Sequence, residues 1–236
     1  MADQHISSAY DRDLDAITTL IMKMGGLVED AILQAAESLA TRDVELAEKV
    51  RKADKVIDAL EMQISEAAAR TIALRAPVSK DLRSVLTVLR LAAALERIGD
   101  YAKNMAKRTS VLVDMSPIAG AEASLRRMAR EVQGMLKDTL DAYIRGDAQL
   151  AEDVRQHDQD VDQMYNALFR EFLTFMMEDP RNITACMHLH FMAKNIERMG
   201  DLTTNMAEQV IYLITGEMPE EARPKSDKTS YMTEPK

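Results

Sequence analysis

The chain has 236 residues and a formal net charge of −9, with 47% apolar and 29% charged residues. The apolar content is enough for a sizeable core, and the charged content excludes a membrane protein or a disordered chain. No basic run offers a surface for nucleic acid, and the single cysteine, Cys186, excludes an internal disulfide. No signal peptide or membrane-spanning apolar run is present, so we expect a cytoplasmic protein.

Three long helices are predicted in the first half of the chain. Apolar residues recur every three or four positions over residues 7–39, from residue 43 to the break at Ala76-Pro77, and over residues 80–113. Ser79 follows the proline and is expected to cap the third of these helices. Residues 85–95 are apolar almost all round, which predicts that this third helix lies deepest.

The second half follows the same plan. Helices are predicted over residues 121–144, 147–177 and 182–215, with a turn at Gly146 and a break at Pro180. Gly216 is expected to end the last helix in a left-handed conformation. Residues 217–236 show no periodic apolar stripe and are predicted to be a disordered tail.

The two halves also share residues. The segment DVELAEKVRKADKVID from Asp43 matches DAQLAEDVRQHDQDVD from Asp147, and ALERIGDYAKNMA from Ala94 matches NIERMGDLTTNMA from Asn195. A duplicated unit of about 100 residues is too long for common helical repeats and fits a three-helix bundle. The predicted fold is therefore all-α, with six long helices in two tandem three-helix bundles related by a pseudo-twofold axis. The bundles span residues 7–115 and 118–216, side by side or end to end.

Acidic pairs at i, i+4 spacing stand in matching places of both halves. They are Asp54 and Asp58, Glu96 and Asp100, Asp158 and Asp162, and Glu197 and Asp201. Such pairs project from one side of a helix and repel each other, so a multivalent cation would turn repulsion into ligation. Asn104 and Asn205, one turn further on, would add amide oxygens. Gly99 and Gly200 occupy equivalent positions of the two halves, and each lowers helix propensity there. This suggests that another backbone or a cluster comes close to the helix at both positions.

Other readings of the acidic pairs stay open at this point. A charged helix face is usually solvated, and duplication by descent also preserves neutral residues. His190 is one candidate for an extra ligand, although a packed histidine is the commoner case. Glu61 lies on the face of Asp54 and Asp58, but Tyr165 replaces it in the second half, so two sites on these carboxylates are expected to differ in affinity or occupancy. No Glu-x-x-His, Ser-His-Asp, Walker or Rossmann pattern occurs, and we predict that the chain is not an enzyme.

The duplicated E-R-[IM]-G-D-x-x-x-N-M-A block, placed in two three-helix units, resembles the PhoU family over nearly the whole chain. This resemblance implies two metal sites on the E(D)-x-x-x-D carboxylates, with iron or zinc as the metal ion and manganese or magnesium not excluded. The implied ligands of the first site are Asp54, Asp58, Glu96 and Asp100, and those of the second are Asp158, Asp162, Glu197 and Asp201.

The resemblance also implies a function. Family members are negative regulators of phosphate uptake and of phosphate-regulon signalling, acting as cytoplasmic adaptors between the ATPase of a phosphate ABC transporter and a sensor histidine kinase. The expected protein is a homodimer that binds no nucleic acid and reaches the membrane only through these partners. A metal store or metal-dependent enzyme is the alternative, and a plain helical scaffold with solvated acids is the third hypothesis.

Overall fold

The computed structural model describes residues 2–219, with side chains from Ala9 onward. Its six long helices are α1 (Ala2–Ala40), α2 (Val44–Arg75), α3 (Ser79–Leu112), α4 (Ala121–Arg145), α5 (Ala148–Glu178) and α6 (Ile183–Thr215), with a short 3-10 helix, η1 (Pro180–Asn182), before α6. Helices therefore form where the apolar periodicity predicts them, and the described part of the chain contains no strand. The predicted tail falls almost entirely on residues 220–236, outside the described range.

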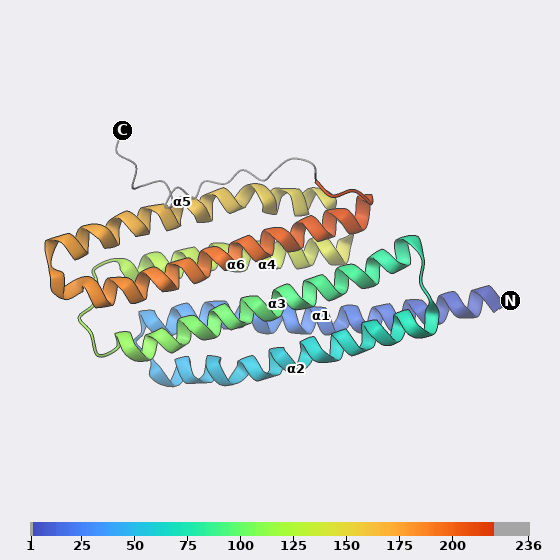
Figure 1. The fold of residues 1–236 in the computed structure, drawn as a ribbon, viewed down its shortest axis with the longest axis horizontal. Coiled ribbons are helices and arrows are strands. Elements are labelled where there is room, and N and C mark those ends of the chain that lie inside the picture. Colours follow the sequence, from blue (N-terminus) through green and yellow to red (C-terminus); the bar gives the residue numbers. More distant parts are fainter. Residues whose placement is uncertain (1, 220–236) are drawn as a thin grey trace.

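The two halves lie side by side in two layers (Figure 1). Helices α2, α3, α6 and α5 form one row in that order, and α1 and α4 lie behind it. Contacts between the halves pair α3 with α6 and α1 with α4. The same helices of the two repeats thus meet each other, as a pseudo-twofold axis requires. The buried apolar side chains form one continuous core through both halves.

Local sequence explains four of the helix ends. Asp43 and Asp147 occupy equivalent positions before α2 and α5, and each side chain accepts a hydrogen bond from a backbone N–H of the first turn, at 2.9 Å from Leu46 and 3.0 Å from Leu150. Gly146 and Gly216 end α4 and α6 with positive φ values of 64° and 87°, which confirms the predicted turn and cap.

Two details differ from the prediction. Ser79 is not the N-cap of α3 but its first residue, and Val78 occupies the cap position with no side-chain hydrogen bond. The helix is not buried all round either, since Leu86 is 44% exposed and Arg90 is exposed. The row α2-α3-α6-α5 covers α3 on two sides and α1 covers its back, so the front of α3 faces solvent.

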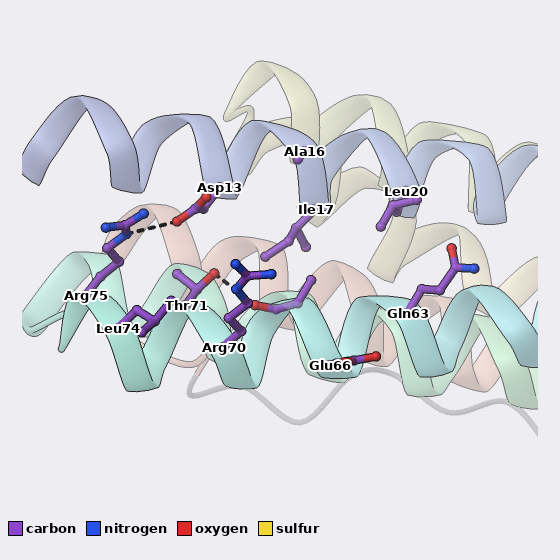
Figure 2. Close-up of a pocket in the computed structure, with 11 residues that line it drawn as sticks. Asp13, Ala16, Ile17, Leu20, Gln63, Glu66, Arg70, Thr71, Leu74 and Arg75 are labelled. Atoms are coloured by element: carbon purple, nitrogen blue, oxygen red, sulfur yellow. Dashed lines mark hydrogen bonds and ion pairs between the residues drawn. The ribbon is translucent and has the colours of Figure 1, made fainter.

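A groove of about 400 Å³ lies between α1 and α2 (Figure 2). Ile17, Leu20 and Leu74 contribute apolar surface, and an ion pair of 2.9 Å between Arg75 Nε and Asp13 Oδ2 lies at one end. None of the eight predicted metal ligands lines this groove. None of the helices within residues 2–219 is both long enough and apolar enough to cross a membrane.

We expect the adjacent glycines of α1 to respond differently to alanine. A Cβ on Gly25 would clash with Leu140 of α4, whereas a Cβ on Gly26 meets nothing within 4 Å. Gly26→Ala should stabilise the protein by about 1 kcal/mol through helix propensity. Gly25→Ala should fall short of that gain by about 1–3 kcal/mol because Leu140 must move. Thermal unfolding of both variants measures the difference, and equal melting temperatures would contradict close packing between α1 and α4.

Candidate carboxylate clusters on the outer helix pairs

The first set of predicted carboxylates comes together between α2 and α3. Asp58, Asp100 and Asp54 all act electrostatically on Glu96, although they belong to two different helices. Burial, followed by the charges of these neighbours and of Glu61, raises the pKa of Glu96 above its usual value. Burial, with Asp54 as the largest neighbouring charge, likewise raises the pKa of Asp58. The structure therefore concentrates negative charge where the pattern predicts it.

Gly99 allows the two helices to approach each other at this cluster. A Cβ on Gly99 would lie 3.1 Å from Cδ1 of Ile57 and 3.7 Å from Oδ1 of Asp54. The close approach predicted for the glycine is confirmed, and side chains of α2, rather than its backbone, come close. Asp54 is 4% exposed, and its Oδ1 atom is buried with no hydrogen-bond partner among the described residues.

A lysine of α3 enters the first cluster. The Lys103 ammonium group donates to Oδ2 of Asp54 at 2.5 Å and to Oδ1 of Asp100 at 2.7 Å, which connects α2 to α3. These two hydrogen bonds, led by that to Asp100, raise the pKa of Lys103 well above its usual range. Its counterpart in the repeat is Thr204, which is buried. Sequence reasoning missed Lys103 because it lies outside the acidic motif, three residues beyond Asp100.

The second cluster lies between α5 and α6 and is more deeply buried. Asp158, Asp162 and Glu197 are 2%, 4% and 5% exposed. Oδ1 of Asp158 would be 3.3 Å from a Cβ placed on Gly200, so this glycine also allows a carboxylate to approach α6. Buried carboxylates need compensating charge or hydrogen bonds. Lys194 supplies part of the compensating charge through an ion pair of 2.9 Å with Oε1 of Glu197.

The two clusters differ around the residue that replaces Glu61. Tyr165 is buried, and the Lys194 ammonium group lies 4.8 Å from its ring centre. His190 lies 5.9 Å from the same ring and 5.4 Å from the ring of Phe169. Burial, followed by the charge of Lys194, lowers the pKa of His190 and keeps it neutral. The histidine is packed among aromatic rings, so the surroundings of the two clusters differ, and a difference in affinity or occupancy between two metal sites stays a prediction.

The remaining candidates lie on the surface. Asn104 and Asn205 are both exposed. Across residues 2–219, no three His, Cys, Asp or Glu side chains are gathered closely enough to hold a metal ion as they stand. The donor types nevertheless suit a hard or borderline cation, since each helix pair offers four carboxylates. The orphaned Oδ1 atom of Asp54 has the chemistry of such a ligand.

We expect the charge of Glu96 to destabilise the metal-free protein. Because its folded pKa is raised, the folded chain holds the proton more tightly than the unfolded chain does, and ionisation lowers stability above the folded pKa. Glu96→Gln should therefore raise the melting temperature at pH 7 by roughly 1–3 °C in chelator-treated buffer. The gain should shrink as the pH falls toward the usual glutamate value of 4.5.

A thermal melt series over pH 4–8 makes this measurement. Glu66→Gln is the matched control, because Glu66 is an exposed residue of α2. A lower melting temperature for Glu96→Gln at pH 7 would show that the glutamate charge is compensated and would contradict this description of the cluster.

Fold and clusters together define a duplicated three-helix-bundle protein that carries one acidic cluster in each half. Comparison with known proteins identifies the family: the PhoU domain matches residues 21–109 and 125–210. The chain belongs to the PhoU family. The fold class and the resemblance predicted from the sequence are thus confirmed.

Relatives match along almost their whole length. The "phosphate-specific transport system accessory protein PhoU homolog" of Rhizobium meliloti (strain 1021) is 44% identical over 230 residues, which cover 98% of this chain and 97% of the relative. The homolog with the same name from Xylella fastidiosa (strain 9a5c) is 45% identical over 226 residues, covering 96% and 95%.

Solved structures of the family have the same fold. The crystal structure of PhoU from Pseudomonas aeruginosa matches with a TM-score of 0.85 and 36% identity, over 88% of this chain and 100% of that chain. That of the phosphate transport system regulatory protein PhoU from Streptococcus pneumoniae has a TM-score of 0.83 and 29% identity, over 90% and 100%.

Proposed function

We propose that this chain is a regulatory accessory protein of a phosphate uptake system. The observation that carries the proposal is full-length similarity to relatives named as phosphate-specific transport accessory proteins. The chain acts in the cytoplasm by contact, as a homodimer and not as an enzyme. It connects the ATPase of a phosphate ABC transporter to the sensor histidine kinase of the phosphate regulon, and it keeps that kinase from activating its response when phosphate is abundant.

Direct binding tests the adaptor role. The purified chain is immobilised, and the transporter ATPase and the cytoplasmic part of the kinase, both from the same organism, are passed over it separately. We expect saturable binding of each partner with a Kd in the micromolar range or tighter, as is typical of specific regulatory contacts. A chain that binds neither protein would overturn the adaptor proposal.

A metal-binding role for the carboxylate clusters is a second proposal. Two observations support it: the Oδ1 atom of Asp54 is buried without a hydrogen-bond partner among the described residues, and the pKa of Glu96 is raised. Both indicate that the negative charge of this cluster is not fully compensated. The residues that would hold the ions are the four carboxylates of each cluster: Asp54, Asp58, Glu96 and Asp100, then Asp158, Asp162, Glu197 and Asp201. An ion would neutralise like charges and connect the two helices, and in the first cluster it would displace the Lys103 ammonium group.

Elemental analysis of the purified protein tests this proposal, together with melting curves in added iron, zinc, manganese or magnesium. A bound ion should raise the melting temperature, and the rise should grow with the logarithm of the ion concentration divided by its Kd. Glu96→Gln with Glu197→Gln should remove both the ion and the shift. The control, Glu45→Gln with Glu178→Gln, changes two exposed glutamates outside the clusters. Equal metal content in all three proteins would contradict the assignment.

A further inference from the structure

Five arginines lie along the front seam where α3 meets α6. We use "the arginine seam" for Arg83, Arg90, Arg97 and Arg108 of α3 together with Arg198 of α6. The two helices run in opposite directions, since Arg90 contacts Gln209 at 2.6 Å and Arg108 contacts His188 at 3.2 Å. Figure 1 shows α3 and α6 side by side at the centre of the front row.

Spacing keeps these arginines in line. Arg83, Arg90 and Arg97 recur every seven residues, a step that turns an α-helix by only about 20° from the starting direction. From Arg83 to Arg108 the stripe extends roughly 38 Å along α3. Arg90, Arg97 and Arg198 are exposed. The stripe is therefore long, narrow and accessible.

Aromatic rings of the opposite helix support several of the guanidinium groups. Arg108 lies 4.4 Å from the ring centre of Phe191, Arg83 lies 5.5 Å from that of Tyr212, and Arg198 lies 6.0 Å from that of Tyr101. Phe191 is 46% exposed. Arginine and aromatic side chains together are the composition that protein interfaces favour.

No carboxylate neutralises the arginine seam in the part of the chain that the structure describes. Six other arginines form ion pairs with carboxylates, whereas none of these five does. The Nε atoms of Arg83 and Arg108 are buried and have no hydrogen-bond partner among the described residues. Burial lowers the pKa of Arg108, which is the expected sign for a cation removed from water without compensation. A chain of net charge −9 thus carries five positive groups in a row that form no ion pair with a carboxylate of residues 9–219.

The acidic clusters of the same two helices lie toward the outer helices α2 and α5. Asp100 pairs with Lys103 toward α2, and the cluster of Glu197 lies toward α5. Carboxylate clusters therefore flank the stripe on both sides. A flat anionic membrane or a nucleic-acid duplex would meet these carboxylates, whereas a single helix, about 10–12 Å wide, would meet only the arginines.

We propose that the arginine seam is the docking surface for an acidic, amphipathic helix of a partner protein. Carboxylates of that helix, repeated at seven-residue steps, pair with the guanidinium groups, and its apolar side chains contact Phe191 and Tyr101. Only the identity of the partner protein rests on the proposed function. If that function is right, the docking helix belongs to the transporter ATPase or to the kinase.

Charge reversal in the full-length chain tests this surface. The test variant is Arg90→Glu, Arg97→Glu and Arg198→Glu, and its matched control is Lys49→Glu, Lys52→Glu and Lys55→Glu, three exposed positions of α2. The first probe is a fluorescein-labelled 25-residue helical peptide with glutamates at seven-residue steps, followed by anisotropy at low and high salt. Vesicles of phosphatidylcholine and phosphatidylglycerol are the second probe, and the transporter ATPase and the kinase are the third and fourth.

We expect the wild-type chain to bind the peptide and to lose affinity as salt rises. The test variant should bind at least about tenfold more weakly, the control within about twofold of the wild type, and the milder Arg→Gln version of the test variant between them. Melting curves confirm that each variant is folded. Equal peptide binding by wild type and test variant, no binding by the wild type, or a preference for the vesicles would overturn the proposal.

The partner probes separate this inference from the proposed function. Peptide binding through the seam with no binding to the ATPase or the kinase would leave the surface standing and reject those partners. Binding of a partner that survives charge reversal would leave the adaptor role standing and reject the seam as its docking surface.

Discussion

Replacing Lys103 with methionine should destabilise the metal-free protein by about 1–2 kcal/mol. The lysine is the one charge that the structure shows pairing with both Asp54 and Asp100, and the Asp54 side chain is only 5% exposed. Removing one partner of a buried pair leaves an uncompensated charge, which is the costly case. The side chain of Lys103 is itself 37% exposed, and water screens its charge. The expected loss of stability is therefore well below that for removing one partner of a fully buried ion pair.

A double-mutant cycle isolates this interaction. Asp54→Asn alone removes the charge that needs compensation, and in that background Lys103→Met should cost less than about 0.5 kcal/mol. Lys107→Met, one turn further along α3 at an exposed position, is the matched control and should change stability little. Denaturant unfolding measures all five proteins. Additive losses in the double mutant would show that Lys103 and Asp54 are not coupled.

Replacing Gly200 with valine should cost about 2–3 kcal/mol and disturb the second cluster. A Cβ at this position already lies 3.3 Å from Oδ1 of Asp158, 3.4 Å from Cγ1 of Val161 and 3.7 Å from Cγ2 of Val132. These neighbours are short or branched and belong to packed helices, so they have little room to move. The added methyl groups would push α6 away from α5 and separate the carboxylates on the two helices.

Gly134→Val provides the control for this substitution. Gly134 lies within α4, and a Cβ there meets nothing within 4 Å. It therefore carries the same change in side chain and in helix propensity without the overlap. Thermal or denaturant unfolding compares the two variants. Equal stability of Gly200→Val and Gly134→Val would contradict close packing at the acidic motif.

Much of the fold follows from local signals. Apolar periodicity locates all six helices, and Asp43, Asp147, Gly146 and Gly216 mark helix ends through short-range hydrogen bonds and backbone preferences. Such signals depend on residues a few positions apart. The prediction for Ser79 was wrong because it needed more than local information. A serine after proline is typical of an N-cap, but whether its side chain reaches an N–H group of the first turn depends on how the loop between α2 and α3 folds.

Features that depend on which helices pack together could not be predicted. Apolar periodicity does not distinguish side-by-side from end-to-end bundles, because both arrangements bury the same apolar stripes. Lys103 and Lys194 lie at non-equivalent positions of the repeat, so the duplicated pattern did not reveal the cation in each cluster. The arginine seam was invisible for a related reason. Arg97 and Arg198 look like isolated surface charges until α3 and α6 are known to be neighbours.

The repeat itself was the most informative signal about the site. Duplicated acidic pairs and glycines correctly indicate where α3 meets α2 and where α6 meets α5, since Gly99 and Gly200 both lie against an aspartate of the neighbouring helix. Whether metal ions bind at these places stays a prediction. The burial of the individual carboxylates could not be predicted from the repeat, because equivalent residues differ: Asp58 is exposed, whereas its counterpart Asp162 is 4% exposed.

Under the proposed function, this chain restrains phosphate uptake and phosphate-regulon signalling when phosphate is abundant. The most direct measurement is the activity of a phosphatase reporter of that regulon in high phosphate, with the gene present, deleted, and restored. We expect low activity with the gene, constitutive activity in the deletion strain, and a return to low activity with the wild-type chain. A reporter that stays low in the deletion strain would contradict this regulatory role.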